Sequence, residues 1–268
     1  GLCGCLLWRD TSPDSCRILL RKRGFQARVD RFSAGVGRFA RLQDTMKLSI
    51  SLLCVLVTAA CTGTSALAFD KSGNALEPAS STAYPLVFQG HELAGTAIRV
   101  KKIAFVPIQV YAVGLYVDPK SLGELKAWKA RSHSDLSKDS ALFRALLKDN
   151  KLTKTLRLVM VRTVTGEQMG SAISEAVESR LPHNQDGECK QAFAGLKGMF
   201  SAPSLKTGTE ILFRWSPGGK LGVTMDGKDA GLLSSEALAA SLFDVFLGEK
   251  AVVERAALIE RLPDLLAG

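Results

Sequence analysis

The sequence predicts an α+β fold in which an antiparallel sheet is covered on one face by helices. Two long strand candidates follow each other directly, Ala97–Phe105 and Ile108–Val117, and Pro107 separates them. The helical segments then come in groups and do not alternate one by one with strands. Paired strands and grouped helices favour this class over a parallel sheet with crossover helices.

The strand predictions begin with a short segment, Tyr84–Gln89. The two long strands that follow are apolar on both alternations, so we expect both of their faces to be covered. Asp118-Pro119 ends the second long strand, and a further strand is predicted over Thr155–Val164.

Helices are predicted on either side of that last strand. Ser121–Ala130 and Asp135–Leu147 precede it, and the second of these has its apolar residues on one side, as an amphipathic helix requires. Thr165-Gly166-Glu167-Gln168 has the pattern of a capping box and should begin a helix that reaches about Leu181. The remaining predicted elements are a helix at Asp186–Met199, strands at Thr209–Trp215 and Lys220–Met225 around the turn Ser216-Pro217-Gly218-Gly219, and terminal helices at Ser235–Leu247 and Glu254–Leu266.

The first part of the chain differs in composition from the rest. Residues 1–45 hold nine Lys and Arg against four Asp, which is +5 of the formal net charge of +9. The first methionine is Met46, and it begins a segment with one lysine, an apolar run and the small residues Ser65-Ala66-Leu67-Ala68. We interpret Met46–Ala68 as a cleaved signal peptide and residues 1–45 as a non-folding basic extension or upstream translated sequence. A basic targeting arm is the alternative for residues 1–45.

Targeting through the secretory pathway follows from that interpretation. Ala66-Leu67-Ala68-Phe69 resembles the plastid-targeting signal of algae with complex plastids, and secretion or periplasmic export is the alternative. Residues 69–84 are rich in Ser, Ala and Pro and are expected to be a flexible linker or transit segment. The folded domain is then predicted over residues 85–268.

Several classes of chemistry have no motif in this sequence. There is no GxSxG elbow, no GxGxxG after a strand, no Walker loop and no CxxC. Cys189 is the only cysteine of the predicted domain, and His91, His133 and His183 are scattered without metal-ligand spacing. We therefore expect no metal, no cofactor, no nucleic-acid partner, no stable membrane span after signal cleavage, and a monomer.

Two polar residues stand out inside the apolar strands. Arg99 lies in the first long strand and Tyr111 in the second. A guanidinium group suits a carboxylate or another planar anion, and a nearby phenol could add a hydrogen bond. Alternatively, Arg99 reaches water at a strand end and Tyr111 is an ordinary core residue. Arg157 and Arg162 are expected on a solvated edge.

The longer stretches of the domain resemble the chalcone isomerase family, in particular its fatty-acid-binding and chalcone-isomerase-like branch. The stretches that carry this resemblance are GTAIRVKKIAFVPIQVYAVGLYV, LKAWKARS, KDSALFRALL, LRLVMVRTVTGEQM and LFDVFLGEKAV, in the family's order from about Pro85 to Leu266. The resemblance implies an open-faced β-sandwich, which is a large curved antiparallel sheet covered by a layer of helices, with a ligand cleft between them.

The resemblance also implies where a ligand would lie. Arg99 matches the family arginine, and Tyr111 stands at the position of the catalytic threonine. The catalytic tyrosine, lysine and asparagine of true isomerases correspond to Met169, Ala172 and Ala176. The Ser or Thr near the C-terminus corresponds to Val245, which Phe246 follows.

These replacements predict a binding protein and not an isomerase. Four polar positions have become apolar, while the arginine is kept, so the cleft should suit a long chain with a carboxylate head. The resemblance implies a fatty acid or similar ligand held at its carboxylate by Arg99 and Tyr111. The alternatives are a chalcone isomerase, which is an intramolecular lyase that closes a flavanone ring, and another lipid-related enzyme on the same scaffold.

Overall fold

The computed structural model describes residues 68–148 and 151–268, which belong to one compact unit, Ser65–Gly268. Residues 1–45 and residues 46–67 of the predicted signal peptide lie outside the described residues, so both interpretations stay predictions. Within the described part of the chain, no helix is both long enough and apolar enough to cross a membrane.

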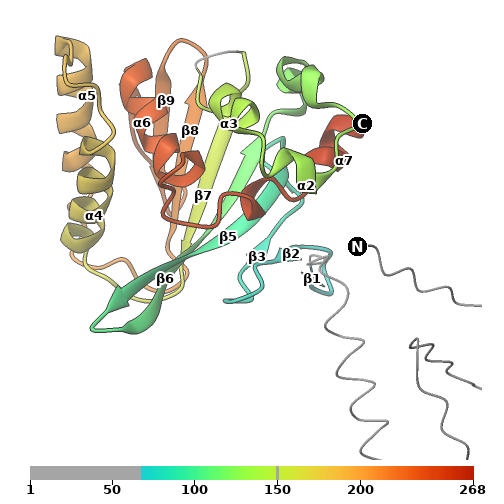
Figure 1. Cartoon of the computed structure of the whole chain (residues 1–268). Helices are drawn as coiled ribbons and strands as arrows, with labels where there is room; N and C mark the ends of the chain where they lie inside the picture. The colour runs from blue at the N-terminus through green and yellow to red at the C-terminus, as the bar shows by residue number, and fades with distance from the viewer. Residues whose placement is uncertain (1–67, 149–150) are drawn as a thin grey trace, which may run out of the picture. The chain divides into compact units, whose positions relative to one another are not determined.

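A seven-stranded antiparallel sheet forms the centre of the described unit (Figure 1). Its order is β10-β9-β8-β7-β6-β5-β4, so each strand pairs with its neighbours in the chain. The strands are β4 (Val87–Phe88), β5 (His91–Ile103), β6 (Val106–Val117), β7 (Lys154–Met160), β8 (Glu210–Ser216), β9 (Lys220–Met225) and β10 (Lys228–Ser234). This confirms the predicted α+β class.

Helices cover one face of this sheet, as Figure 1 shows for α4 and α6. The helical segments are η1 (Pro119–Trp128), α2 (His133–Leu136), α3 (Ser140–Leu146), α4 (Gly166–Glu178), α5 (Gly187–Gly198), α6 (Glu236–Leu247), η2 (Ala257–Ile259) and α7 (Leu262–Ala267). The main core lies between these helices and the sheet, and β6 contributes Tyr111, Val113, Leu115 and Val117 to it. We call this helix-covered side of the sheet the inner face.

The predicted helix starting at Thr165 is confirmed, together with its cap. The Thr165 side chain accepts a hydrogen bond from the Gln168 N–H, and the Gln168 side chain accepts one from the Thr165 N–H. This reciprocal pair satisfies donors that helix geometry leaves free, and so it determines where α4 begins.

Two other predicted helices are broken in the structure. Asp135–Leu147 is divided into α2 and α3, because Asp139 caps α3 by accepting hydrogen bonds from the N–H groups of Ala141 and Leu142. Glu254–Leu266 is likewise divided into η2 and α7, and Pro263 occupies the first turn of α7. Proline has no N–H to continue an earlier helix but is well suited to a first turn.

The segment 69–84 is folded, which contradicts the prediction of a flexible linker. It contributes to a small sheet of three short strands, β1 (Ala68–Phe69), β2 (Ala75–Leu76) and β3 (Ala83–Tyr84). Tyr84 is fully buried, and its ring lies against Gly114 on the outer face of the large sheet, where a Cβ at Gly114 would collide with it. The N-terminal segment therefore covers part of the face that the helices leave open.

Arg157 is buried on this outer face, and its predicted place on a solvated edge is wrong. The residue is only 8% exposed and forms a two-point ion pair with Glu210, in which Nε donates over 3.3 Å. Its Nη1 also donates to the carbonyl oxygen of Ala83 (3.2 Å), and its guanidinium carbon lies 5.1 Å from the ring centroids of Tyr84 and Phe88. Arg157 thus joins the N-terminal segment to the sheet.

We expect the variant Arg157→Ala to lose about 2–3 kcal/mol of unfolding free energy, since it leaves half-buried Glu210 and the Ala83 carbonyl without their partner. Urea denaturation measures the loss. The matched control is Arg131→Ala, which removes an exposed arginine paired with Asp139 and should have a much smaller effect. Equal losses in the two variants would contradict the role assigned to Arg157.

Candidate functional site

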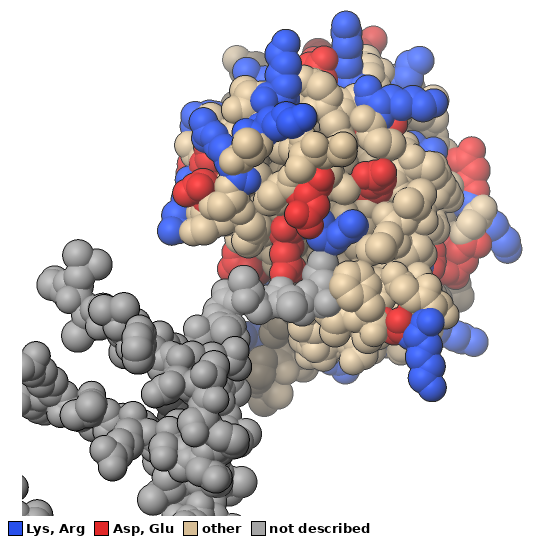
Figure 2. Space-filling view, turned by 90° about the vertical axis from the view of Figure 1, so that its right-hand side faces the viewer, with Lys and Arg blue, Asp and Glu red and all other residues tan. Residues whose placement is uncertain are grey.

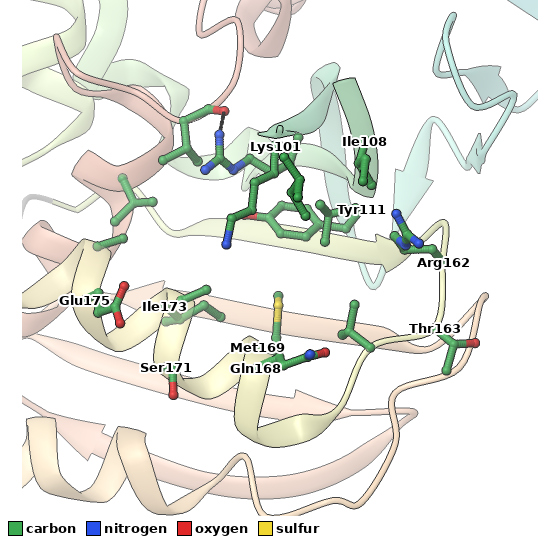
Figure 3. Close-up of a pocket in the computed structure, with 18 residues that line it drawn as sticks. Lys101, Ile108, Tyr111, Arg162, Thr163, Gln168, Met169, Ser171, Ile173 and Glu175 are labelled. Carbon is green, nitrogen blue, oxygen red and sulfur yellow. Dashed lines mark hydrogen bonds between the residues drawn. The ribbon is translucent and has the colours of Figure 1, made fainter. Parts of the chain in front are cut away.

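A pocket of about 840 Å³ lies between the inner face of the β5–β6 hairpin and helix α4 (Figure 3). This volume is within the range of roughly 300–1,000 Å³ that small-molecule sites occupy. Its lining residues are Arg99, Lys101, Ile103, Ile108, Val110, Tyr111, Arg162, Thr163, Val164, Gln168, Met169, Ser171, Ala172, Ile173, Glu175, Ala176, Val245 and Val252.

Arg99 and Tyr111 meet at this pocket because they are direct partners in the β5–β6 ladder. Residues directly opposite each other in an antiparallel pair have their side chains on the same face of the sheet. Tyr111 is 6% exposed, and Arg99 is half-buried. Both side chains therefore reach the pocket from the inner face.

The Arg99 guanidinium is held by backbone carbonyls. Its Nη1 donates to the carbonyl oxygens of Val252 (3.0 Å) and Val100 (3.2 Å), and the first of these bonds is the dashed line in Figure 3. In residues 68–148 and 151–268, Arg99 forms no ion pair, and its Nε and Nη2 donate no hydrogen bond. An anchored arginine with unused donors can take a planar anion by two hydrogen bonds.

The Tyr111 hydroxyl adds a neutral donor beside this cation. Burial raises the pKa of Tyr111 well above its ordinary value, and the nearby charge of Arg99 offsets only part of the rise. The phenol therefore keeps its proton at neutral pH. Phe246 packs against the Tyr111 ring, with centroids 6.3 Å apart and planes tilted by 56°.

The opposite wall comes from helix α4 and the C-terminal part of α6. Met169, Ala172 and Ala176 recur at spacings of three and four residues, which places them on one side of α4. Figure 3 shows Met169 directed from α4 toward Tyr111. Val245 of α6 completes this part of the wall. The core packing of Met169, Ile173 and Val177 determines which side of α4 faces the sheet.

Six of the seven predicted site residues line this one pocket. They are Arg99, Tyr111, Met169, Ala172, Ala176 and Val245. Phe246 does not line it and instead packs against the Tyr111 ring. The binding role of these residues stays a prediction.

Sequence reasoning missed the pocket residues Lys101, Ile103 and Ile108. Lys101 and Ile103 follow Arg99 at intervals of two, so strand alternation alone could have identified them. Ile108 could not be found in this way, because a bulge between Arg99 and Val100 changes the alternation on β6. Arg162 also lines the pocket and is exposed, as predicted for a solvated edge.

The charged groups around the pocket favour an anion. Arg99, Lys101 and Arg162 line it together with a single carboxylate, Glu175. Among the described residues, no group of three or more His, Cys, Asp and Glu could hold a metal ion. The arrangement can bind and orient an anionic head beside a largely apolar wall.

Comparison with known proteins agrees with this architecture. A model of the chalcone-flavanone isomerase family matches residues 58–265. Chalcone isomerase-like protein 2 of Humulus lupulus is 28% identical over 149 residues, which are 54% of this chain and 71% of that protein. Chalcone–flavanone isomerase 1 of Arabidopsis thaliana is 27% identical over 200 residues, which are 70% of this chain and 78% of that protein.

Among solved structures, a fatty-acid binding protein of Arabidopsis thaliana has the same fold. Its TM-score is 0.63 at 21% sequence identity, and the match covers 72% of this chain and 98% of that one. The shared fold confirms the predicted layer of helices on an antiparallel sheet, and the match of the family model over most of the chain identifies the family. The chain belongs to the chalcone-flavanone isomerase family.

Proposed function

We propose that this protein is a non-catalytic, chalcone-isomerase-like binder of a fatty acid or similar long-chain carboxylate. The observation that carries the proposal is the pairing of Arg99 with Tyr111 on the inner face, opposite an apolar wall of α4. Arg99 and Tyr111 would hold the carboxylate, and the chain would extend along the wall that includes Met169, Ala172 and Ala176. The fatty-acid binding protein of the same fold supports this class of ligand.

The energetics of such a ligand are reasonable. Each buried methylene contributes about 0.8 kcal/mol, so about eleven of them give roughly 9 kcal/mol as an upper figure. Association costs at least ~4 kcal/mol. A charge-assisted hydrogen bond to the head adds about 1.5–3 kcal/mol, which brings the dissociation constant to roughly the micromolar range. Arg99 would therefore contribute both affinity and the preference for an acid.

We expect the variant Arg99→Gln to lower the affinity for palmitic acid by about 10- to 100-fold, which is the range expected for one charge-assisted hydrogen bond. The affinity for hexadecanol should change little, because the alcohol carries no charge for Arg99 to bind. Displacement of a fluorescent fatty acid measures both affinities.

Arg162→Gln is the matched control for this experiment. It removes an exposed arginine that lines the same pocket, and its effect should be the smaller one, because solvent screens exposed charges. Equal losses in Arg99→Gln and Arg162→Gln, or equal losses for the acid and the alcohol in Arg99→Gln, would show that Arg99 is not the headgroup site.

The apolar wall generates a second prediction. Ala176 is half-buried on α4, and Ala176→Phe should fill part of the pocket and lower the affinity for palmitic acid about tenfold or more, since space for several methylenes is lost. Ala141→Phe, on the exposed side of α3 and away from the pocket, is the control. Unchanged binding by a correctly folded Ala176→Phe protein would place the chain elsewhere.

Chalcone isomerase activity is the second candidate, because the family model and several relatives carry that name and Arg99 is kept. Cyclisation needs donors that polarise the ketone, and Met169, Ala172 and Ala176 provide none at the corresponding positions. We expect purified protein to leave the spontaneous cyclisation of naringenin chalcone unaccelerated in an absorbance assay. A rate that rises in proportion to protein concentration, and falls in Arg99→Gln, would favour the isomerase.

A further inference from the structure

The turn between β5 and β6, residues 103–106, exposes apolar side chains together. Phe105 is 98% exposed, Val106 58% and Ile103 52%. In the described part of the chain, these three make up half of the six large hydrophobic residues identified as exposed. Single exposed apolar residues are normal on protein surfaces, whereas exposed apolar residues that gather in one place are typical of interaction sites. We call residues 103–106 the hairpin tip.

The backbone of the hairpin tip is unfavourable for its residues. Ile103 pairs directly with Val106, so Ala104 and Phe105 form a two-residue turn, with φ angles of 45° and 70°. Turns of this kind normally use Asn and Gly, because positive φ is costly for residues with larger side chains. Phe105 is almost fully exposed, so its packing does not offset this cost. Unfavourable backbone that stability does not explain tends to occur at functional sites.

The charged residues near the turn of the hairpin are all basic, and the one acidic residue of β5 and β6, Glu92, lies at the opposite end of β5. Between Leu93 and Val117 the sequence holds Arg99, Lys101 and Lys102 but no Asp or Glu. Lys101 and Lys102 are exposed and lie directly before the hairpin tip. The face of the molecule in Figure 2 has acidic and basic side chains beside one another, so basic side chains without an acidic neighbour are not general on that surface.

The hairpin tip is also continuous with the pocket. Lys101 and Ile103 line the pocket, and their partners across the ladder are Ile108 and Val106. Figure 1 shows the β5–β6 turn extending past the ends of the neighbouring strands at the lower left. The strand wall that begins at Arg99 therefore leads outward to the exposed apolar side chains.

We propose that the hairpin tip docks on the surface of a bilayer that contains anionic lipids, so that a long-chain acid passes between the bilayer and the pocket. Phe105 and its apolar neighbours enter the interface between headgroups and acyl chains, and Lys101 and Lys102 contact the anionic headgroups. This inference rests on the proposed function. A protein partner fits less well, because one turn offers far less than the roughly 1,200 Å² of a specific protein interface.

Vesicle flotation tests the docking without any fatty acid present. Vesicles of phosphatidylcholine with added phosphatidylserine are compared with vesicles of phosphatidylcholine alone. The full chain and residues 65–268, which form one compact unit with its own core, are both measured. We expect binding to the anionic vesicles and much weaker binding to the neutral ones.

Variants of the hairpin tip should reduce this binding. Phe105→Ser should weaken vesicle binding about tenfold, because the phenylalanine that would enter the bilayer interface is lost. Lys102→Glu should weaken it at least about fivefold, because the glutamate is repelled by anionic headgroups. The matched controls are Leu232→Ser, another exposed hydrophobic residue on β10, and Lys220→Glu at the start of β9. If Phe105→Ser or Lys102→Glu of residues 65–268 binds as well as its control, or if the unchanged 65–268 unit does not bind anionic vesicles, the proposal is overturned.

A second measurement separates this proposal from the binding function. Phe105 and Lys102 do not line the pocket, so affinity for a fluorescent fatty acid free in solution should stay unchanged in Phe105→Ser and Lys102→Glu. Transfer of the same acid from anionic vesicles to the protein should slow about as much as vesicle binding weakens. If the unsubstituted protein does not bind the fluorescent fatty acid in solution, the binding function is refuted. If Phe105→Ser and Leu232→Ser take up the acid from vesicles at equal rates, only the docking is refuted.

Discussion

The register between β5 and β6 is the constraint on which the site depends. Arg99 faces the pocket because it lies directly opposite Tyr111, and a shift of one residue would turn its side chain to the outer face. The bulge beyond this pair adds Val110 to β6 and lets the inner face continue through Ile108 toward the turn. One register thus brings together the cation, the phenol and the strand wall of the pocket.

Two arginines on opposite faces show how surroundings decide what a residue does. Arg157 is buried, paired with Glu210 and covered by Tyr84, so its charge is used within the protein. Arg99 is anchored only by carbonyl oxygens and keeps unused donors, within the part of the chain that the structure describes. An arginine bound to neutral acceptors remains a cation available to a ligand, and we base the proposed function on this difference.

Much of the fold could be predicted because the signals were local, whereas most candidate site residues came from the resemblance to the family. The capping box at Thr165 predicted the start of α4, and the apolar runs predicted β5 and β6. The predicted break at Pro107 is wrong, because the turn lies at Ala104 and Phe105 and Pro107 is part of β6. The burial of Arg157 and the folding of segment 69–84 could not be predicted. Arg157 is covered by this segment, and the segment is held by the hydrogen bond from Arg157 to the Ala83 carbonyl oxygen. Strand β10 was also missed, since a bulge between Asp229 and Gly231 interrupts its alternation. Long-range partners, unlike caps and periodicity, leave no mark in a single sequence.

A crystal structure of the protein with bound palmitic acid would show directly which residues hold the carboxylate. We expect both carboxylate oxygens to lie within hydrogen-bond distance of the Arg99 guanidinium or the Tyr111 hydroxyl, with the acyl chain along Met169 and Ala176. A carboxylate placed at Lys101 or Arg162, with the acyl chain directed toward Arg99, would contradict this expectation. The same holds for a fatty acid bound outside this pocket.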